Sequence, residues 1–147
     1  ETHVRFGEKV HSPIVTPGEA DAVVGLEKLE ALRFAHYLNI ETGTVLVNDH
    51  ELVPGSVPNA ESIYPRETID FLKSKGMRVV ALPASQTARD LGDARMANVV
   101  MLGALSTLLP IEQEVWEKTL KLRIPAKYLD GNLKAFESGY DAMQKAI

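Results

Sequence analysis

Three nearly continuous runs of apolar residues stand out along the chain, over residues 20–26, 44–47 and 77–82. Continuous runs of this kind predict strands that are buried on both faces, because a strand with one face in water alternates apolar and polar residues. Strands covered on both faces are typical of parallel sheets flanked by helices. The pattern therefore predicts a sheet with at least three buried strands.

The segments between these runs predict two crossover helices. After the first run, leucines recur every three residues, at Leu26, Leu29 and Leu32, which is a helical spacing. After the second run comes a long connection, and Pro65 then begins another predicted helix, which Gly76 ends just before the third run. Alternation of strand and helix predicts parallel pairing of the strands.

A different pattern precedes the first buried strand. Residues 4–6 and 9–15 are two short runs on either side of Gly7 and Glu8, and a two-residue connection with glycine first suits a tight hairpin turn. Pro13 interrupts the second run, so we expect that strand to lie at an edge or to be bulged. An antiparallel hairpin is therefore predicted near the N-terminus.

The last third of the chain is predicted to be helical from Ser85 onward. Asp93 suits the N-cap of a helix over 94–109, which is apolar on nearly all sides and is expected to be the buried spine of the domain. Gly103 inside this helix is best accommodated where another backbone comes close. Two further helices follow, and the last one carries an apolar stripe formed by Leu133, Phe136, Tyr140 and Met143.

Together these elements predict an α/β fold of the three-layer α/β/α type, with a mainly parallel central sheet and an antiparallel hairpin near the N-terminus. The 147 residues fit a single domain over 1–147. The contents of 45% hydrophobic and 24% charged residues are ordinary for a globular protein.

Charge and cysteine content exclude several functions. The net charge of −4 gives no general attraction to nucleic acid or to an anionic membrane. The chain has no cysteine, which excludes disulfides, thiolate nucleophiles, cysteine-ligated zinc and ordinary iron–sulfur clusters within it. The longest apolar stretch, over 97–110, is too short to span a bilayer. We expect a soluble, cytoplasmic protein.

No catalytic, cofactor-binding or metal-binding residue can be assigned from motifs. The four histidines show no metal-ligand spacing, and His36, on an apolar helix, is expected to be packed or half-exposed. No nucleophile elbow or phosphate-binding loop is present, and Gly25 stands alone after the first buried strand. Glu27 and Glu30 are interpreted as solvated acids in the first turn of a helix.

The most specific polar positions are Arg95 and Asn98, which are three residues apart on one face of the predicted spine helix, with Ser106 near that face two turns later. One interpretation is that Arg95 pairs with a carboxylate of the same chain and Asn98 bonds a nearby loop. The other is that both residues contact another subunit. The sequence leaves these two interpretations open.

Five segments, in this order, resemble the gamma-type subunits of 2-oxoacid:ferredoxin oxidoreductases, and among them the small (beta) subunit of indolepyruvate ferredoxin oxidoreductase. They are HVRFGEKVHSPIV, GEADAVVGLEKLEALRFAHYL, GTVLVN, LGDARMANVVMLGALSTLLP and GNLKAFESGY, and they span nearly the whole chain. The resemblance is carried by the set of segments, since no single one is a catalytic signature.

The resemblance implies an accessory subunit of a multi-chain enzyme. Such enzymes decarboxylate a 2-oxoacid on thiamine diphosphate, pass electrons through iron–sulfur clusters to ferredoxin and release an acyl-CoA, and here the substrate would be an aryl pyruvate such as indolepyruvate. Thiamine diphosphate, magnesium and the clusters would lie in the large (alpha) catalytic subunit, and no cofactor is expected on this chain. The implied partners are that large subunit, ferredoxin through the complex, and, as an alternative, a second copy of the chain.

The chain departs from the family pattern at its start. Members of the family begin with a strand and a glycine-rich G-x-G-G-x-G turn, and an Arg-Gly-Gly run comes just before the part that matches residues 3–6. These features are absent, and the chain begins with Glu1, so we expect an N-terminal truncation and little independent activity.

Two other functions compete with the accessory subunit, which predicts an obligate partner and exposed apolar surface. A stand-alone nucleotide- or CoA-binding module would need a glycine-lined phosphate site at a helix N-terminus. A purely structural or assembly domain would have no ligand and would be favoured by self-association.

Overall fold

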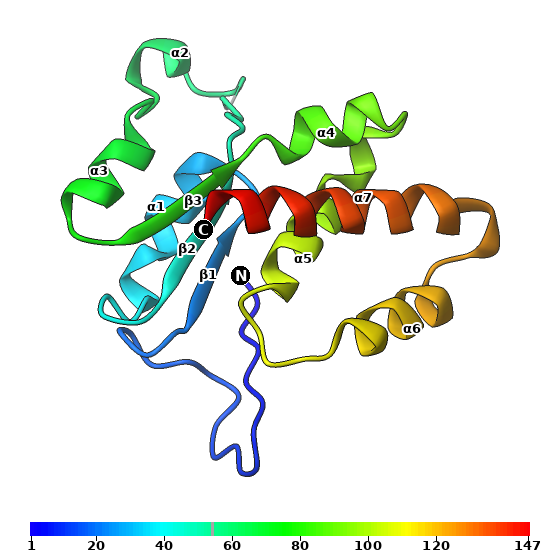
Figure 1. The fold of residues 1–147 in the computed structure, drawn as a ribbon. Helices are drawn as coiled ribbons and strands as arrows, with labels where there is room; N and C mark the ends of the chain where they lie inside the picture. The colour runs from blue at the N-terminus through cyan, green and yellow to red at the C-terminus, as the bar shows by residue number, and fades with distance from the viewer. Residues whose placement is uncertain (54) are drawn as a thin grey trace.

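A sheet of three parallel strands forms the centre of the molecule, in the order β1-β2-β3. The computed structural model of the chain describes residues 1–53 and 55–147, apart from the side chains of residues 60 and 62 (Figure 1). The strands are β1 (Ala22–Gly25), β2 (Thr44–Asn48) and β3 (Arg78–Leu82). All three predicted strands are confirmed, and all three are parallel.

Helices cover both faces of this sheet, as the three-layer prediction requires. On one face lie α1 (Lys28–Phe34) with its 3₁₀ extension η1 (Ala35–Tyr37), and α3 (Thr68–Ser74). The short helix α2 (Ala60–Ile63) lies in the long connection after β2 (Figure 1).

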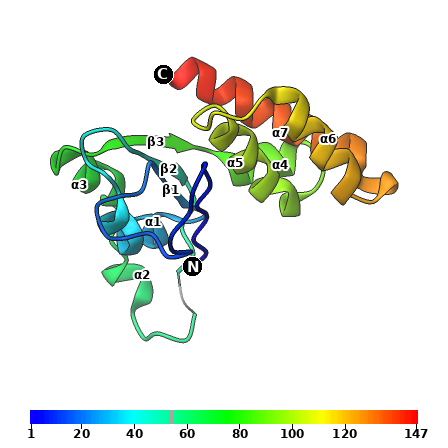
Figure 2. The ribbon, with the colours of Figure 1, turned by 90° about the horizontal axis from the view of Figure 1, so that it is seen from below.

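The other face is covered by the C-terminal helices. These are α4 (Ala84–Asp90), the 3₁₀ turn η2 (Ala94–Met96), α5 (Ala97–Ser106) and α7 (Ala126–Ala146). The remaining helix, α6 (Gln113–Arg123), packs on α7, where the Trp116 and Phe136 ring centroids are 6.0 Å apart (Figure 2). In the described part of the chain, no helix is both long and apolar enough to cross a membrane.

Alternate residues of the strands supply two separate cores. Val45 and Val47 of β2 point to the α1–α3 side, whereas Leu46 points to the α5–α7 side. This division follows from the two-residue period of a strand. Because both sides are apolar, β2 is a continuous apolar run, as predicted.

The crossing of α5 and α7 is the tightest contact of the fold. A methyl group added at Gly103 would overlap the carbonyl group of Phe136, and one added at Gly139 would overlap the carbonyl group of Val100. Only glycine permits this approach of the two backbones. The expectation that Gly103 marks a close backbone contact, and that its helix is the buried spine, is confirmed.

The spine helix is shorter than predicted. It starts with the 3₁₀ turn η2, capped by the Asp93 carboxylate, and the α-helix ends at Ser106 instead of reaching Leu109. The hydroxyl groups of Ser106 and Thr107 donate to the carbonyl oxygens of Gly103 and Ala104, at 2.6 and 2.8 Å. Such bonds from the side chain to the preceding turn compete with continuation of the helix.

The predicted N-terminal hairpin is wrong in that its two limbs are not strands. Residues 1–19 contain no strand, although the chain reverses direction within them (Figure 1). Side chains bridge the two limbs instead: the Arg5 Nη1 atom donates to the Ile14 carbonyl oxygen at 3.0 Å, and the Val15 amide donates to His3 Nδ1 at 3.0 Å. Pro13 has no amide hydrogen, so the second limb cannot form a continuous ladder.

Candidate functional site at the carboxyl edge of the sheet

The carboxyl ends of the three strands meet at one edge, where open α/β sheets bind their ligands. Asn48, the last residue of β2, is buried there. Its Nδ2 atom donates to the Leu26 carbonyl oxygen at 3.0 Å and to Ser85 Oγ at 2.8 Å, and its Oδ1 atom accepts from the Ser85 amide at 3.1 Å. One side-chain amide therefore joins the segments that follow all three strands.

Glu27 is the second buried polar residue of this edge. Its carboxylate caps α1 by accepting from the Glu30 amide at 3.1 Å. It also accepts from the Leu52 amide at 3.3 Å and from the Tyr64 hydroxyl. These bonds hold the long connection after β2 against the turn between β1 and α1. The interpretation of Glu27 as a solvated acid is therefore wrong.

A chain of ion pairs continues from Glu27 towards solvent. Lys28 Nζ lies 2.8 Å from the Asp49 carboxylate and 3.1 Å from that of Glu51, and Arg66 bridges Glu51 and Glu61 at 2.6 and 2.9 Å. The hydrogen bond to Asp49 is the main reason that the pKa of Lys28 is raised. We call the residues of this edge the carboxyl-edge network: Glu27, Lys28, Asn48, Asp49, Glu51, Tyr64, Arg66 and Ser85.

Side chains of the network occupy part of the N-termini of the two helices that begin here. A carboxylate already occupies the N-terminus of α1, and the Ser85 amide in the first turn of α4 is bonded to Asn48. Gly25 lets β1 lie directly against Ala31 of α1, so its role is close packing. These contacts argue against phosphate binding at either helix, which a nucleotide- or CoA-binding module would require.

Three exposed apolar residues are neighbours in sequence of residues in this network. Leu26, Leu52 and Ile63 are exposed. Leu26 precedes Glu27 in the sequence. The Leu52 amide donates to Glu27, and Ile63 precedes Tyr64, whose hydroxyl donates to Glu27. Among the described residues, no group of three His, Cys, Asp or Glu side chains is placed to hold a metal ion. Paired charges flanked by exposed apolar groups are typical of a contact surface.

Arg95 and Asn98 lie away from this edge, on the exposed side of η2 and α5. Arg95 pairs with Asp93 within the chain, with Nη2 and Nε at 2.7 and 3.0 Å from its carboxylate oxygens. The hydrogen bond from the Arg95 side chain is the main reason that the pKa of Asp93 falls to about 2. The expected pairing of Arg95 is confirmed.

The interpretation that Asn98 bonds a nearby loop and the expectation for Ser106 are wrong, whereas contact of Asn98 with another subunit stays a prediction. In the described part of the chain, the exposed Asn98 side chain bonds no loop. Ser106 is buried and bonds the Gly103 carbonyl oxygen, so it does not share the exposed face of Arg95 and Asn98. His36, expected to be packed or half-exposed, is exposed and lies 3.1 Å from the Arg33 carbonyl oxygen through Nδ1.

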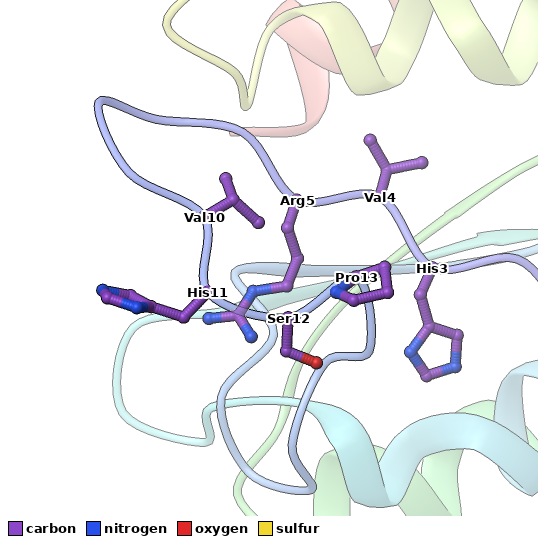
Figure 3. A pocket seen from close by; sticks show the side chains of 7 residues that line it. All are labelled: His3, Val4, Arg5, Val10, His11, Ser12 and Pro13. Carbon is purple, nitrogen blue, oxygen red and sulfur yellow. The ribbon is translucent and has the colours of Figure 1, made fainter.

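The N-terminal segment forms a hollow of about 430 Å³ between its two limbs. Figure 3 shows that Val4 points away from His3 and Arg5, which lie on the other side of the same limb. The lining residues come from this segment alone: His3, Val4, Arg5, Val10, His11, Ser12 and Pro13. The two short runs around Gly7 and Glu8 predicted a hairpin in this segment but gave no signal of a hollow.

Residues 1–142 match the family described as pyruvate ferredoxin/flavodoxin oxidoreductase. The chain belongs to this family. It is similar to the indolepyruvate oxidoreductase subunit IorB of Thermococcus kodakarensis, with 33% identity over 152 residues, 99% of this chain and 74% of the relative.

Two further proteins that are similar to this chain are also named as subunits. The gamma subunit of a keto/oxoacid ferredoxin oxidoreductase from Geobacter sulfurreducens has a similar structure, with a TM-score of 0.66, 26% identity and coverage of 90% of this chain and 69% of that chain. The ketoisovalerate oxidoreductase subunit VorA of Methanothermobacter thermautotrophicus is 28% identical over 146 residues. The match covers 96% of this chain and only 26% of VorA, in which the corresponding region is part of a much longer polypeptide.

Proposed function

We propose that the chain is the small, accessory subunit of a thiamine-diphosphate-dependent 2-oxoacid:ferredoxin oxidoreductase. The proposed substrate is an aryl pyruvate, indolepyruvate in the first place, and the products are acyl-CoA, carbon dioxide and reduced ferredoxin. The observation that carries the proposal is the similarity to an IorB subunit along 99% of the chain, within a family of oxidoreductases. The cellular location we propose is the cytoplasm.

The residues of the chain support an accessory role. Thiamine diphosphate supplies the decarboxylation chemistry of such an enzyme when it is bound, and it needs a metal ion and a diphosphate site. The carboxyl-edge network instead fills its own helix N-termini, and the chain has no cysteine to hold a cluster. We therefore assign thiamine diphosphate, magnesium and the clusters to the large subunit and assign no reaction step to this chain.

Exposed apolar side chains support the partner that this role requires. They occur at the carboxyl edge, in the N-terminal segment and on α6. The partner we propose is the large catalytic subunit.

We also propose that Arg95 and Asn98 contact the large subunit. Asp93 holds the Arg95 guanidinium in place through Nε and Nη2, and the Arg95 guanidinium carbon lies 5.9 Å from the ring centroid of Tyr128, so the side chain is already ordered before binding. An ordered arginine loses less conformational entropy when it binds. Arg95→Glu should weaken association with the large subunit, whereas Arg33→Glu on α1, another exposed arginine that is paired within the chain, should not.

The test of the proposed function is reconstitution. The full chain is mixed with its large subunit, and reduction of an electron acceptor is measured with indolepyruvate, CoA and thiamine diphosphate, and with pyruvate in place of indolepyruvate. We expect activity with indolepyruvate in the mixture and none with the chain alone. Failure of the two proteins to associate, together with CoA binding by the chain alone, would overturn the proposal.

A further inference from the structure

Positive charge is concentrated where α6 ends and α7 begins. Residues 118–129 contain four basic residues and no Asp or Glu, although the net charge of the chain is −4. The four are Lys118, Lys121, Arg123 and Lys127, and all of them are exposed. We call these four residues the basic turn. Such a concentration of like charge in an acidic chain needs a physical reason, because like charges repel one another.

The charges of the basic turn are mostly unpaired. In the part of the chain that the structure describes, no carboxylate lies within ion-pair distance of Lys118, Arg123 or Lys127. Lys121 Nζ lies 3.6 Å from a Glu117 carboxylate oxygen, but both side chains are more than half exposed, so solvent weakens this pair. The positive field of the turn is therefore available to a partner.

The stability of the helices accounts for only part of this pattern. Lys121 and Arg123 lie in the last turn of α6, where basic side chains offset the negative end of the helix dipole. Lys127 lies in the first turn of α7, where the dipole disfavours a cation, and that turn has no acidic residue. The charge of Lys127 therefore does not stabilise its own helix, which favours a role outside the chain.

The basic turn lies at one end of the molecule, away from both ends of the chain. In Figure 1 and in Figure 2, the α6–α7 turn is at the far right, α3 is on the left and residue 1 lies between them. Residue 147 is separated from the turn by the whole of α7, which is 21 residues long. Residues that extend the chain at either end would start away from the turn, which argues against them as its occupant.

The composition of this region favours a transient, acidic protein partner. Its exposed large apolar residues are Leu122 and Tyr128, which are too few for the apolar core of a permanent subunit interface. Lysine is depleted in the centres of such interfaces, whereas exposed basic residues steer an acidic partner and make its binding fast and salt-dependent. A nucleic acid or an anionic membrane is disfavoured, because the acidic remainder of the chain would repel it.

We propose that the basic turn docks the acidic surface of the ferredoxin that receives electrons from the enzyme. This inference rests on the proposed function, in which ferredoxin must bind and leave in every turnover. Lys127 Nζ lies 4.6 Å from the Tyr128 ring centroid, and Arg95, proposed above to contact the large subunit, lies against the same ring. The basic turn would then border the subunit that holds the clusters. Its role is to steer and orient the acceptor, while the electron passes from the large subunit to ferredoxin.

The test uses the full chain assembled with its large subunit, and ferredoxin from the same organism as the acceptor. At about 0.1 M salt, Lys118→Glu/Arg123→Glu/Lys127→Glu should raise the KM for ferredoxin about tenfold or more, because the charges that attract the acceptor are reversed. The rate with methyl viologen should stay within about twofold of the original, because a small acceptor needs no protein docking surface.

The matched control is Lys73→Glu/Lys75→Glu/Arg78→Glu. These three exposed residues lie in α3, directly after it and at the start of β3, and their reversal changes the net charge by the same amount. The control should raise the KM for ferredoxin by no more than about threefold, because exposed charges beyond a Debye length of the docking site are largely screened. Added salt should raise the KM of the original enzyme towards that of the basic-turn variant.

An equal KM for the two variants, or a KM that does not change with salt, would overturn the docking proposal and leave the proposed function standing. Loss of assembly in the basic-turn variant alone would make the turn a subunit interface. Salt-sensitive binding of duplex DNA or of phosphatidylserine vesicles by the original chain would make it a site for those ligands. Either result overturns the proposal. If the original chain does not assemble with the large subunit at all, the proposed function fails and this inference fails with it.

Discussion

The α5–α7 crossing and the N-terminal segment, residues 3–15, place their backbones in opposite surroundings. At the crossing, Gly103 and Gly139 each lie against a carbonyl group of the other helix, and no side chain separates the two helices there. In the N-terminal segment, no amide or carbonyl group of residues 3–15 bonds another backbone group among the described residues. Four large apolar side chains of this segment are exposed.

This difference separates stability from association. Close packing contributes to the free energy of unfolding, so changes at the crossing should alter it. Val4 and Phe6 of the N-terminal segment are exposed, so changes at these two residues should leave that free energy almost unchanged. The carboxyl-edge network lies between these cases, since its charges are paired inside the chain but its apolar neighbours are exposed.

The largest expected effect is at the crossing. Gly103→Ala should lower the free energy of unfolding by about 3 kcal/mol or more, because the added methyl group meets the Phe136 backbone, which cannot rotate away. Urea denaturation of the full chain measures this. The control is Gly55→Ala, where an added Cβ has no atom within 4 Å, with an expected change within about 0.5 kcal/mol. Equal midpoints for the two variants would show that the helices are not in backbone contact.

The next effect is at Glu27. Glu27→Ala should cost about 2 kcal/mol, because it removes the cap of α1 and leaves the Tyr64 hydroxyl and the Leu52 amide without their acceptor. Tyr64→Phe provides the control. It should destabilise the original chain but have little effect once Glu27 is alanine, since the two side chains are bonded to each other. Additive losses would mean that these side chains do not interact.

A smaller effect is expected from pH at Asp93. Its pKa is lowered from 3.8 to about 2 in the folded chain, so its pairing stabilises the fold above about pH 4 and is lost as the pH falls to about 2. Asp93→Asn retains the capping role but not the charge. The urea midpoints of the original chain and this variant should therefore differ near neutral pH and converge in acid. A difference that does not change with pH would contradict the ion pair.

The smallest effect on the free energy of unfolding is expected from the N-terminal segment. Val4→Asp/Phe6→Asp should leave the free energy of unfolding within about 0.5 kcal/mol of the original, because both side chains are exposed. A clear loss of stability would show that Val4 and Phe6 pack on the rest of the domain.

Features that depend on neighbouring residues were the predictable ones. The three strands follow from apolar runs, and the close contact at Gly103 follows from a glycine inside a buried helix. The end of the spine helix was missed by a few residues, because the hydroxyls of Ser106 and Thr107 bond the preceding turn. Apolar spacing carries no information about such bonds.

Features that depend on distant residues were not predictable. Glu27 follows a strand like many exposed helix-capping acids, and it is buried only because the connection carrying Tyr64, 37 residues later, folds back over it. The hairpin failed for a related reason. Its two limbs have the composition of strands, but a ladder needs backbone amides that can donate in register. Pro13 has no amide hydrogen, and Arg5 and His3 bond backbone groups of the second limb through their side chains.

Trp116 is the only tryptophan of the chain, and it packs beside Phe136 where α6 meets α7. Its indole Nε1 atom is buried and has no hydrogen-bond partner in the described part of the chain. Intrinsic fluorescence excited at the indole therefore reports on this helix pair alone. Emission should be blue-shifted in the folded chain and move to the red when α6 separates from α7. Conformational changes in the N-terminal segment or at the carboxyl edge of the sheet should leave the spectrum unchanged.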